Sequence, residues 1–290
     1  NRYQYYNAEK GWVSFINFRY MNDKKQTGEL DFDSKKDKGT TNYWGSEINT
    51  ERLDVATKVG YVFPDMPYQS IGFQNAFDSH NQHSYFGLNQ YNIKQSSYYS
   101  NLIFNSIINN TMNKFATGLN FTYDKYQEFV NVNDYSRIDN SVGAFFEYTY
   151  DNGDDFSVIL GGRIDNHNRL GTFITPRLHM RYNPWDKGVL RFSAGRGKRS
   201  ANIFAENQPL FASSRTFEIL NSNGKIYGLN PEIAWNYGLS FSQKFSFLGK
   251  SADVGFDLYR TDFQNQAIVD VMQSPQEVLF YNLDGKSYAN

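Results

Sequence analysis

Hydrophobic and polar residues alternate with period two along most of the chain, and helical periodicity is almost absent. From Leu53 to Phe63, every second residue is apolar or threonine, and the residues between them as far as Tyr61 are Asp, Ala, Lys and Gly. The stretches Phe115–Tyr123 and Trp235–Phe241 repeat this pattern. Such alternation is typical of a β-strand whose two faces differ. We count about twelve such segments of roughly 9 to 13 residues, a length that lets a tilted strand cross a bilayer. Their centres lie near residues 16, 57, 74, 102, 119, 145, 160, 177, 193, 239, 257 and 281.

The connections between these segments alternate between short and long. The short ones are rich in Pro, Gly, Asn and Asp, which are the residues of tight turns; they are residues 64–67, 109–113, 151–155, 183–188 and 247–250. The long ones are residues 21–50, 80–96, 124–136, 199–231 and 264–276, and a shorter connection, residues 166–171, falls on their side. Short turns at one end and long loops at the other are characteristic of outer-membrane barrels.

The two faces of the predicted strands carry different residues. One face holds Phe, Tyr, Leu and Val, and the other holds Gly, Ser, Asn, Thr and charged residues. The charged members of the polar face are Asp54, Lys58, Asp78, Glu147, Arg163, Asp165, Arg177, Arg181, Arg191, Asp253 and Asp257. A soluble β-sandwich or jelly roll with one wet face would show a similar alternation, but the loop pattern favours a barrel that is polar inside and apolar outside. The predicted fold class is therefore all-β: an antiparallel transmembrane β-barrel, present as an incomplete piece of about twelve strands.

Composition narrows the possible functions. The 290 residues include 22 Tyr and 25 Phe, and aromatic rings suit the two interfaces of a membrane barrel. The net charge of −1 argues against a nucleic-acid partner, which would require a basic excess on one face. The chain has no cysteine, so it has neither disulfides nor thiolate metal sites. It also lacks a run of about 18 apolar residues, so no transmembrane helix is expected.

A series of short motifs in the second half of the chain resembles a known family. In order along the chain they are Gly161–Asp165 (GGRID), Thr175–Leu178 (TPRL), Arg181–Pro184 (RYNP), Val189–Arg199 (VLRFSAGRGKR) and Leu229–Glu232 (LNPE). Each motif is weak alone, but five in this order at barrel spacing are similar to the barrel of TonB-dependent outer-membrane receptors. The resemblance is strong from residue 156 onward and looser before it.

The resemblance implies a barrel of about 22 strands that is plugged by an N-terminal domain. Receptors of this kind import scarce nutrients, such as ferric siderophores, cobalamin, metal complexes or glycans, with energy relayed by TonB. The implied location is the outer membrane of a Gram-negative bacterium. The expected partners are membrane lipid, TonB through an N-terminal region absent from this chain, and a small-molecule or oligosaccharide ligand. A passive porin and a soluble all-β binding or structural module remain as alternatives.

The chain departs from the full family pattern. It shows no plug domain, no TonB-box segment and no final strand that ends in an aromatic residue. Its first and last residues read as the middle of structural elements. We therefore expect residues 1–290 to be a partial receptor barrel without its plug.

Four inward arginines and one aspartate are candidate lumen-facing or plug-facing residues: Arg163, Asp165, Arg177, Arg181 and Arg191. They would hold carboxylates of a plug or line a polar lumen. Because an unpaired buried charge is costly, each arginine needs a partner. Pairing with Asp165, Asp253, Asp257 or lumen water is the plainer alternative.

The long connection that follows Arg199 supplies the candidate ligand contacts. In the family such loops help to close over the ligand, and here Phe204, Phe211, Arg215 and Tyr227 are the candidates. Two histidines, His80 and His83, fall in a predicted loop, but three or four convergent ligands are needed for a metal site, so neither a metal nor a cofactor is expected. No Gly-x-Ser-x-Gly motif is present, and no enzyme activity is expected.

Overall fold

The computed structural model describes residues 1–289, with side chains described as far as Leu283. The strands are β1 (Arg2–Asn7), β2 (Trp12–Gly28), β3 (Gly45–Phe63), β4 (Met66–Phe86), β5 (Asn89–Ile108), β6 (Asn110–Val130), β7 (Asn133–Asp134), β8 (Arg137–Asp151), β9 (Phe156–His167), β10 (Gly171–Tyr182), β11 (Gly188–Arg199), β12 (Thr216–Ile219), β13 (Glu232–Phe247), β14 (Lys250–Asp270) and β15 (Glu277–Ala289), and one 3₁₀ helix, η1 (Ala205–Ala212), lies between β11 and β12.

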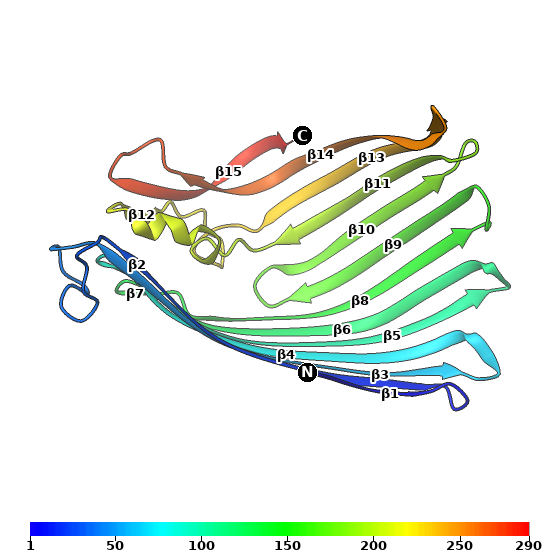
Figure 1. The fold of residues 1–290 in the computed structure, drawn as a ribbon, viewed down its shortest axis with the longest axis horizontal. Helices are drawn as coiled ribbons and strands as arrows, with labels where there is room; N and C mark the ends of the chain where they lie inside the picture. The colour runs from blue at the N-terminus through cyan, green and yellow to red at the C-terminus, as the bar shows by residue number, and fades with distance from the viewer. Residues whose placement is uncertain (290) are drawn as a thin grey trace.

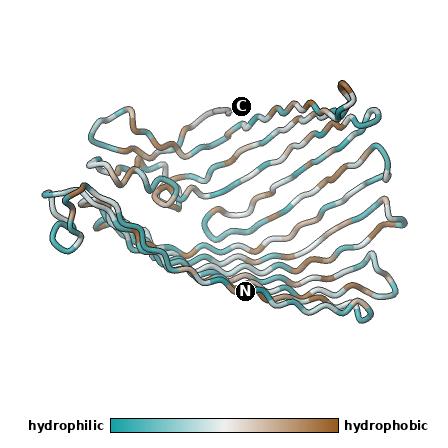
Figure 2. Tube along the Cα trace, in the orientation of Figure 1, coloured by the Kyte–Doolittle hydropathy of each residue, from teal (hydrophilic) through white to brown (hydrophobic). Residues whose placement is uncertain are grey.

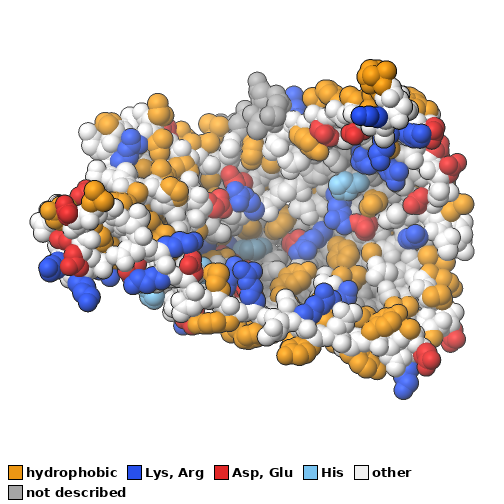
Figure 3. Space-filling view, in the orientation of Figure 1, with side chains coloured by type: hydrophobic (Ala, Val, Ile, Leu, Met, Phe, Trp, Pro, Cys, Tyr) orange, Lys and Arg blue, Asp and Glu red, His pale blue; other side chains and the backbone are white. Residues whose placement is uncertain are grey.

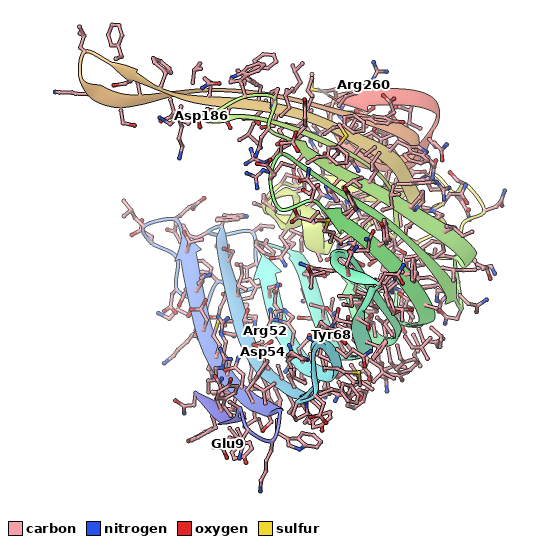
Figure 4. The ribbon with its side chains drawn as sticks, turned by 90° about the vertical axis from the view of Figure 1, so that its right-hand side faces the viewer. Glu9, Arg52, Asp54, Tyr68, Asp186 and Arg260 are labelled. Carbon is pink, nitrogen blue, oxygen red and sulfur yellow. The ribbon has the colours of Figure 1, made fainter. Side chains whose placement is uncertain are left out.

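All these strands join one sheet, and almost all neighbours are antiparallel. The order is β1-β2-β3-β4-β5-β6-β8-β9-β10-β11-β13-β14-β15-β12, with β7 added to β6, and β12 runs parallel to β15. The sheet is strongly curved, so that β1–β3 and β13–β14 bend toward the same side (Figure 1, Figure 4). Each of the twelve expected strand centres falls within one of the twelve long strands, which confirms the predicted fold class. Within the described residues, no helix is long and apolar enough to cross a membrane.

Several strands extend further than the alternation predicted. The prediction of a long loop at residues 80–96 is wrong, because β4 and β5 pair continuously to Phe86 and Asn89 and only residues 87–88 turn the chain. Gly87 takes a positive φ of 59° in this turn, a conformation that favours glycine. Here polar residues occupy both faces, so the period-two signal disappears while the backbone ladder continues. Long connections remain at residues 29–44 and 200–231, opposite the short turns.

The two faces of the sheet have opposite character, as predicted. On the outer, convex face, large apolar side chains are exposed: Phe73 by 45%, Leu119 by 57% and Leu160 by 49%. On the inner, concave face, polar side chains are buried, such as Asn120 and Asp165. Figure 2 shows the alternation along the strands, and Figure 3 shows acidic and basic side chains gathered in the hollow of the inner face. This arrangement is the one that a lipid environment favours.

Phe145 is an exception to the polar inner row, and the sheet register explains it. Its cross-strand partner is Gly118 on β6. A Cβ atom built on Gly118 would lie 2.6 Å from the Phe145 ring and 2.1 Å from the Leu102 carbonyl oxygen. The ring therefore covers the backbone of a strand that has no side chain at this point, a pairing known to protect glycine within sheets.

Alanine at Gly118 is expected to lower the free energy of unfolding by about 1 to 3 kcal/mol, because the added methyl group meets backbone that cannot move aside easily. The matched control is Gly162→Ala, since nothing lies within 4 Å of a Cβ at Gly162. Urea unfolding in detergent micelles measures both variants. Equal effects of the two substitutions would contradict the close approach at Gly118.

Candidate functional site

Residues 200–231, here called the inner segment, fold back over the long-loop end of the sheet instead of extending away from it (Figure 1). The segment contains η1 and the short strand β12, which pairs with β15 from Thr216↔Glu277 to Ile219↔Phe280. Asn89, at the tip of the β4–β5 hairpin, donates from its side-chain amide to the carbonyl oxygens of Phe211 and Ser213, at 3.0 and 2.9 Å. Contacts distant in sequence therefore hold the segment at the C-terminal end of η1 and beyond it.

An apolar cluster joins the inner segment to the sheet. Phe204 and Phe211 are 1% and 0% exposed, and they pack with Tyr91 of β5 and with Phe280 of β15. Ring centroids lie 5.3 Å apart for Tyr91 and Phe211 and 5.6 Å apart for Phe204 and Phe280. Burying a Phe side chain contributes about 1.5 to 3 kcal/mol. This cluster, and not the face of the sheet, is the largest apolar core among the described residues.

A buried charge network lies beside this cluster and consists of Glu128, Arg137, Asp139, Asn202 and Tyr227. The Arg137 guanidinium donates to a Glu128 carboxylate oxygen at 2.8 Å, to the Asn202 amide oxygen at 2.5 Å and to an Asp139 oxygen at 3.1 Å. The Tyr227 hydroxyl donates to Glu128 at 2.5 Å. Glu128 is 0% exposed and the Arg137 side chain 5% exposed. A buried pair needs such additional hydrogen bonds, because desolvation of the two charges is expensive.

Three tyrosines surround these charges, and the nearest ring to the Arg137 guanidinium is that of Tyr126, at 3.9 Å. The Tyr91 hydroxyl donates to the second Glu128 oxygen at 3.0 Å, and the Arg137 guanidinium lies 4.8 Å from the centroid of the Tyr227 ring. Burial, and then the Glu128 carboxylate, raise the pKa of the Tyr227 phenol well above its usual value. The phenol therefore stays protonated and acts as a donor toward Glu128 at any physiological pH. Through Tyr227 and Asn202, the inner segment is bonded to β6 and β8.

Phenylalanine at Tyr227 is expected to lower the free energy of unfolding by about 1.5 to 3 kcal/mol, because it removes a hydrogen bond to a buried carboxylate. Tyr135→Phe is the control: its ring lies 5.6 Å from that of Tyr227, and its hydroxyl makes no hydrogen bond among the described residues. Urea unfolding of both variants in detergent tests this. A loss at Tyr135 as large as the loss at Tyr227 would show that ring packing, and not the hydrogen bond, matters.

The four predicted ligand contacts all lie in the inner segment. Phe204 and Phe211 are buried in the apolar cluster, and Tyr227 is bonded to Glu128. Arg215 is half-buried, and its guanidinium donates to the Val271 carbonyl oxygen at 2.7 Å. These side chains shape and hold the segment, and direct contact with a ligand stays a prediction for all four.

The predicted inward residues fall into paired and unpaired groups. Arg163 binds Asp165 on its own strand through two hydrogen bonds of 2.7 Å. Arg177 of β10 reaches across Gly161 of β9 to the carboxylate of Glu147 on β8. The pairing of Arg163 with Asp165 was one of the partners considered from the sequence, and Glu147 is a partner that the strand order supplies.

Arg181 and Arg191 are different, because they face each other directly across β10 and β11. Arg181 donates to the Asn183 side-chain oxygen at 3.3 Å. Neither guanidinium has a carboxylate partner among the described side chains. Like charges at directly opposite positions of a sheet are destabilising, so this pair leaves positive charge open toward the hollow of the inner face.

Sequence reasoning missed Glu128, which lies in the predicted loop at residues 124–136, and it missed Arg137 and Asp139, which directly follow that loop. In the structure β6 runs on to Val130 and β8 starts at Arg137. A weak signal exists in the alternation of Arg137 and Asp139 around the exposed Ile138. It does not reveal the partner Tyr227, which is 90 residues away from Arg137.

Arg199 was quoted only as the end of a motif, yet it fastens the start of the inner segment. It lies opposite Glu232 in the β11–β13 register and donates to that carboxylate at 2.8 Å. It also binds Glu206 of η1 at 3.0 Å. Arg199 ends the motif Val189–Arg199, and Glu232 ends the motif Leu229–Glu232. Their ion pair therefore joins the two motifs at the point where the inner segment leaves and rejoins the sheet. No group of three His, Cys, Asp or Glu side chains that could hold a metal occurs among the described residues.

The model of one protein family, described as the TonB dependent receptor-like β-barrel, matches residues 1–289. The chain belongs to this family. The family is one of receptors and transporters, and its barrels are outer-membrane proteins of Gram-negative bacteria. No curated protein matches the sequence. Membership confirms the resemblance that the motifs indicated.

Solved structures show the same fold in this receptor family. The siderophore receptor PirA from Pseudomonas aeruginosa aligns with 96% of this chain and 55% of its own, at 12% identity and a TM-score of 0.61. The alcaligin outer-membrane receptor FauA from Bordetella pertussis aligns with 94% of this chain and 45% of its own, at 12% identity and a TM-score of 0.59. The hemophore receptor HasR from Serratia marcescens was solved with its hemophore HasA and heme. It aligns with 96% of this chain and 50% of its own, at 13% identity and a TM-score of 0.61. The receptor barrel described here therefore spans about half the length of these proteins.

Proposed function

We propose that this chain is the barrel portion of an outer-membrane receptor that imports a scarce nutrient with TonB-coupled energy. The nutrient would be a siderophore, cobalamin, another metal complex or a glycan. The chain would lie in the outer membrane of a Gram-negative bacterium, with the long-loop end outside the cell and the short turns in the periplasm. TonB would act through a plug and TonB box belonging to an N-terminal region of the full-length protein.

The observation that carries this proposal is that the inner segment packs over the long-loop end of a barrel that belongs to the receptor family. The segment is held by the apolar cluster and by the buried charge network. A passive porin needs an open passage, whereas a segment packed over the loop end supports capture and controlled entry. The relatives bind a siderophore, alcaligin or a hemophore by name, so the fold alone does not select a cargo.

The charged inner face supports a plug as the neighbour of this wall. Arg181 and Arg191 present two guanidinium groups at facing positions without a carboxylate among the described residues. We infer that carboxylates of a plug domain neutralise them, since unpaired charge in a protein interior is unfavourable. Arg163 and Arg177, which are paired within the wall, would instead form its permanent lining.

The experiment is uptake by cells that express the full-length receptor. Outer membranes are isolated first, and the receptor is expected in that fraction as a band that shifts on heating. Growth on limiting iron, cobalamin or glycan is then compared with and without the receptor, each in the presence and absence of TonB. Growth that needs both proteins supports the proposal. Receptor-dependent growth without TonB would support a porin, and a soluble receptor would refute the membrane assignment.

A further inference from the structure

A pocket that adjoins the apolar cluster and is separate from the buried charge network lies at the long-loop end, where three parts of the chain meet. It is formed by the β2–β3 loop, by the β4–β5 turn and by the residues that follow η1, and its volume is about 450 Å³. Ligand pockets in proteins are commonly of this size. None of the candidate residues discussed above lines it, and it is called the loop pocket here.

The β2–β3 loop, residues 29–44, is held in a defined shape. The Glu29 amide donates to the Trp44 carbonyl oxygen at 3.0 Å, which closes the base of the loop. Further along, the Asp33 amide donates to the Asp37 carboxylate at 2.8 Å, and the Thr40 hydroxyl donates to the Asp37 carbonyl oxygen at 2.8 Å. These bonds define the shape of the loop, which forms one wall of the loop pocket.

The floor of the loop pocket is apolar and its rim is polar. Trp44 and Phe86 form the floor and pack against the apolar cluster. Tyr43, 40% exposed, and Leu88, 61% exposed, stand at the edge. Gly87 has no side chain and allows the Trp44 indole to lie directly against the turn, because a Cβ there would be 2.9 Å from the ring.

The polar groups of the rim are free to bind a ligand. The side chains of Thr41, Asn42, Tyr43 and Ser214 are exposed, and none of their polar atoms has a hydrogen-bond partner among the described residues. Together they offer three hydroxyl groups and one amide, which both donate and accept. A purely hydrophobic ligand would leave these groups unused.

The charge of the lining selects among polar ligands. Among the described residues that line the loop pocket, Glu29 alone is charged, and none is Lys or Arg. An anionic ligand, such as a phosphate or a carboxylate, would meet a carboxylate and no cation in the lining, which is unfavourable. A neutral ligand with many hydroxyl groups would give Glu29 donors to accept from. Its apolar ring face would suit the aromatic floor.

We propose that the loop pocket binds a neutral saccharide, with one sugar ring against the Tyr43 and Trp44 side and its hydroxyl groups on Thr41, Asn42 and Ser214. The site differs from the buried charge network and from the charged hollow of the inner face. Binding of a saccharide in the loop pocket requires neither TonB nor uptake. The saccharide proposal can therefore be tested separately from the proposed receptor function.

The full-length receptor, purified in detergent from outer membranes, is applied to a glycan array that contains neutral, sialylated, sulfated and uronic-acid glycans. Binding to at least one neutral glycan is expected, with about tenfold weaker binding by Tyr43→Ala. Ser214→Trp, which fills the loop pocket, is the second variant and is expected to abolish binding. The control is Tyr68→Ala, because Tyr68 is a comparably exposed tyrosine (45%) at the opposite, short-turn end. A heat-modifiable band establishes that each variant is folded.

Three outcomes would overturn the proposal. The first is a receptor that binds no neutral glycan on the array. The second is binding restricted to acidic glycans. The third is binding by Tyr43→Ala and Ser214→Trp that equals the wild type. Loss of neutral-glycan binding in both variants, with Tyr68→Ala unchanged, would support it.

Discussion

Methionine at Arg137 is expected to lower the free energy of unfolding by about 3 to 5 kcal/mol, because it leaves the Glu128 carboxylate buried without its cation. Glu128 is 0% exposed, so water cannot replace the guanidinium. The hydrogen bond from Arg137 to Asn202 is lost as well, and with it one attachment of the inner segment. Urea unfolding in detergent micelles measures the stability, and limited proteolysis between residues 200 and 231 reports release of the segment.

Two further variants separate the charge from the packing. In Arg137→Met/Glu128→Leu both members of the Arg137–Glu128 pair are removed, while Asp139 keeps its ion pair with Arg169 at 2.9 Å. Most of the lost stability is expected to return, because buried pairs can be replaced by apolar side chains at little cost. Lys25→Ala breaks the ion pair with Asp23, whose side chains are 72% and 41% exposed, and the loss expected there is below about 1 kcal/mol. If Arg137→Met behaves like Lys25→Ala, the buried charge network does not hold the inner segment.

Arginine at Phe73 is expected to lower stability by about 2 to 4 kcal/mol, the cost of a cation at the lipid-facing midplane of a barrel. Phe73 lies on the outer face of β4 and is 45% exposed. The matched control is Gln74→Arg, one residue further along the same strand, where the side chain points to the polar inner face beside Asn101. The fraction of heat-modifiable receptor after refolding into lipid vesicles measures both variants.

The adjacent pair makes the result decisive. Both substitutions place the same side chain on the same strand at almost the same depth. They differ in the face, and also in Lys58 of β3, which lies opposite Gln74 and adds a like-charge repulsion of up to about 1 kcal/mol to the control. Equal folding of Phe73→Arg and Gln74→Arg would contradict a lipid-facing outer surface. Greater damage from Gln74→Arg would mean that the faces are assigned the wrong way round.

Holding the inner segment in place has a consequence for ligand entry. Two of its attachments differ in chemistry: the apolar cluster around Phe211 excludes water, whereas the Arg137 network is directional and specific. Release of the segment would have to break both, together with the β12–β15 pairing and the hydrogen bonds from Asn89. The Arg137→Met variant breaks one of them, so it also provides a receptor in which to compare nutrient uptake with the wild type.

Local alternation was sufficient to place the strands and their two faces. Side chains of a strand point alternately to opposite sides, so the sequence around Phe73 or Leu119 carries its own orientation. The same local signal placed Arg163, Asp165, Arg177, Arg181 and Arg191 on one face of the sheet, in agreement with the register. That this face meets a plug or a lumen stays a prediction. It failed at residues 80–96, where both faces are polar and backbone pairing alone continues the strands.

The tertiary structure alone decided where the inner segment packs and which side chains it contacts. Residues 200–231 have no regular periodicity, and their partners are Asn89, Glu128, Arg137 and Phe280, which lie far away in the sequence. Whether Phe204 is an exposed loop residue or part of a core depends on which strands surround it. The loop pocket likewise needs three segments, which the pairing of β3 with β4 and the return of the inner segment to Asn89 bring together. Period-two alternation is a property of one strand, whereas buried charge pairs and pockets are properties of contacts between distant segments, and a single sequence does not record those.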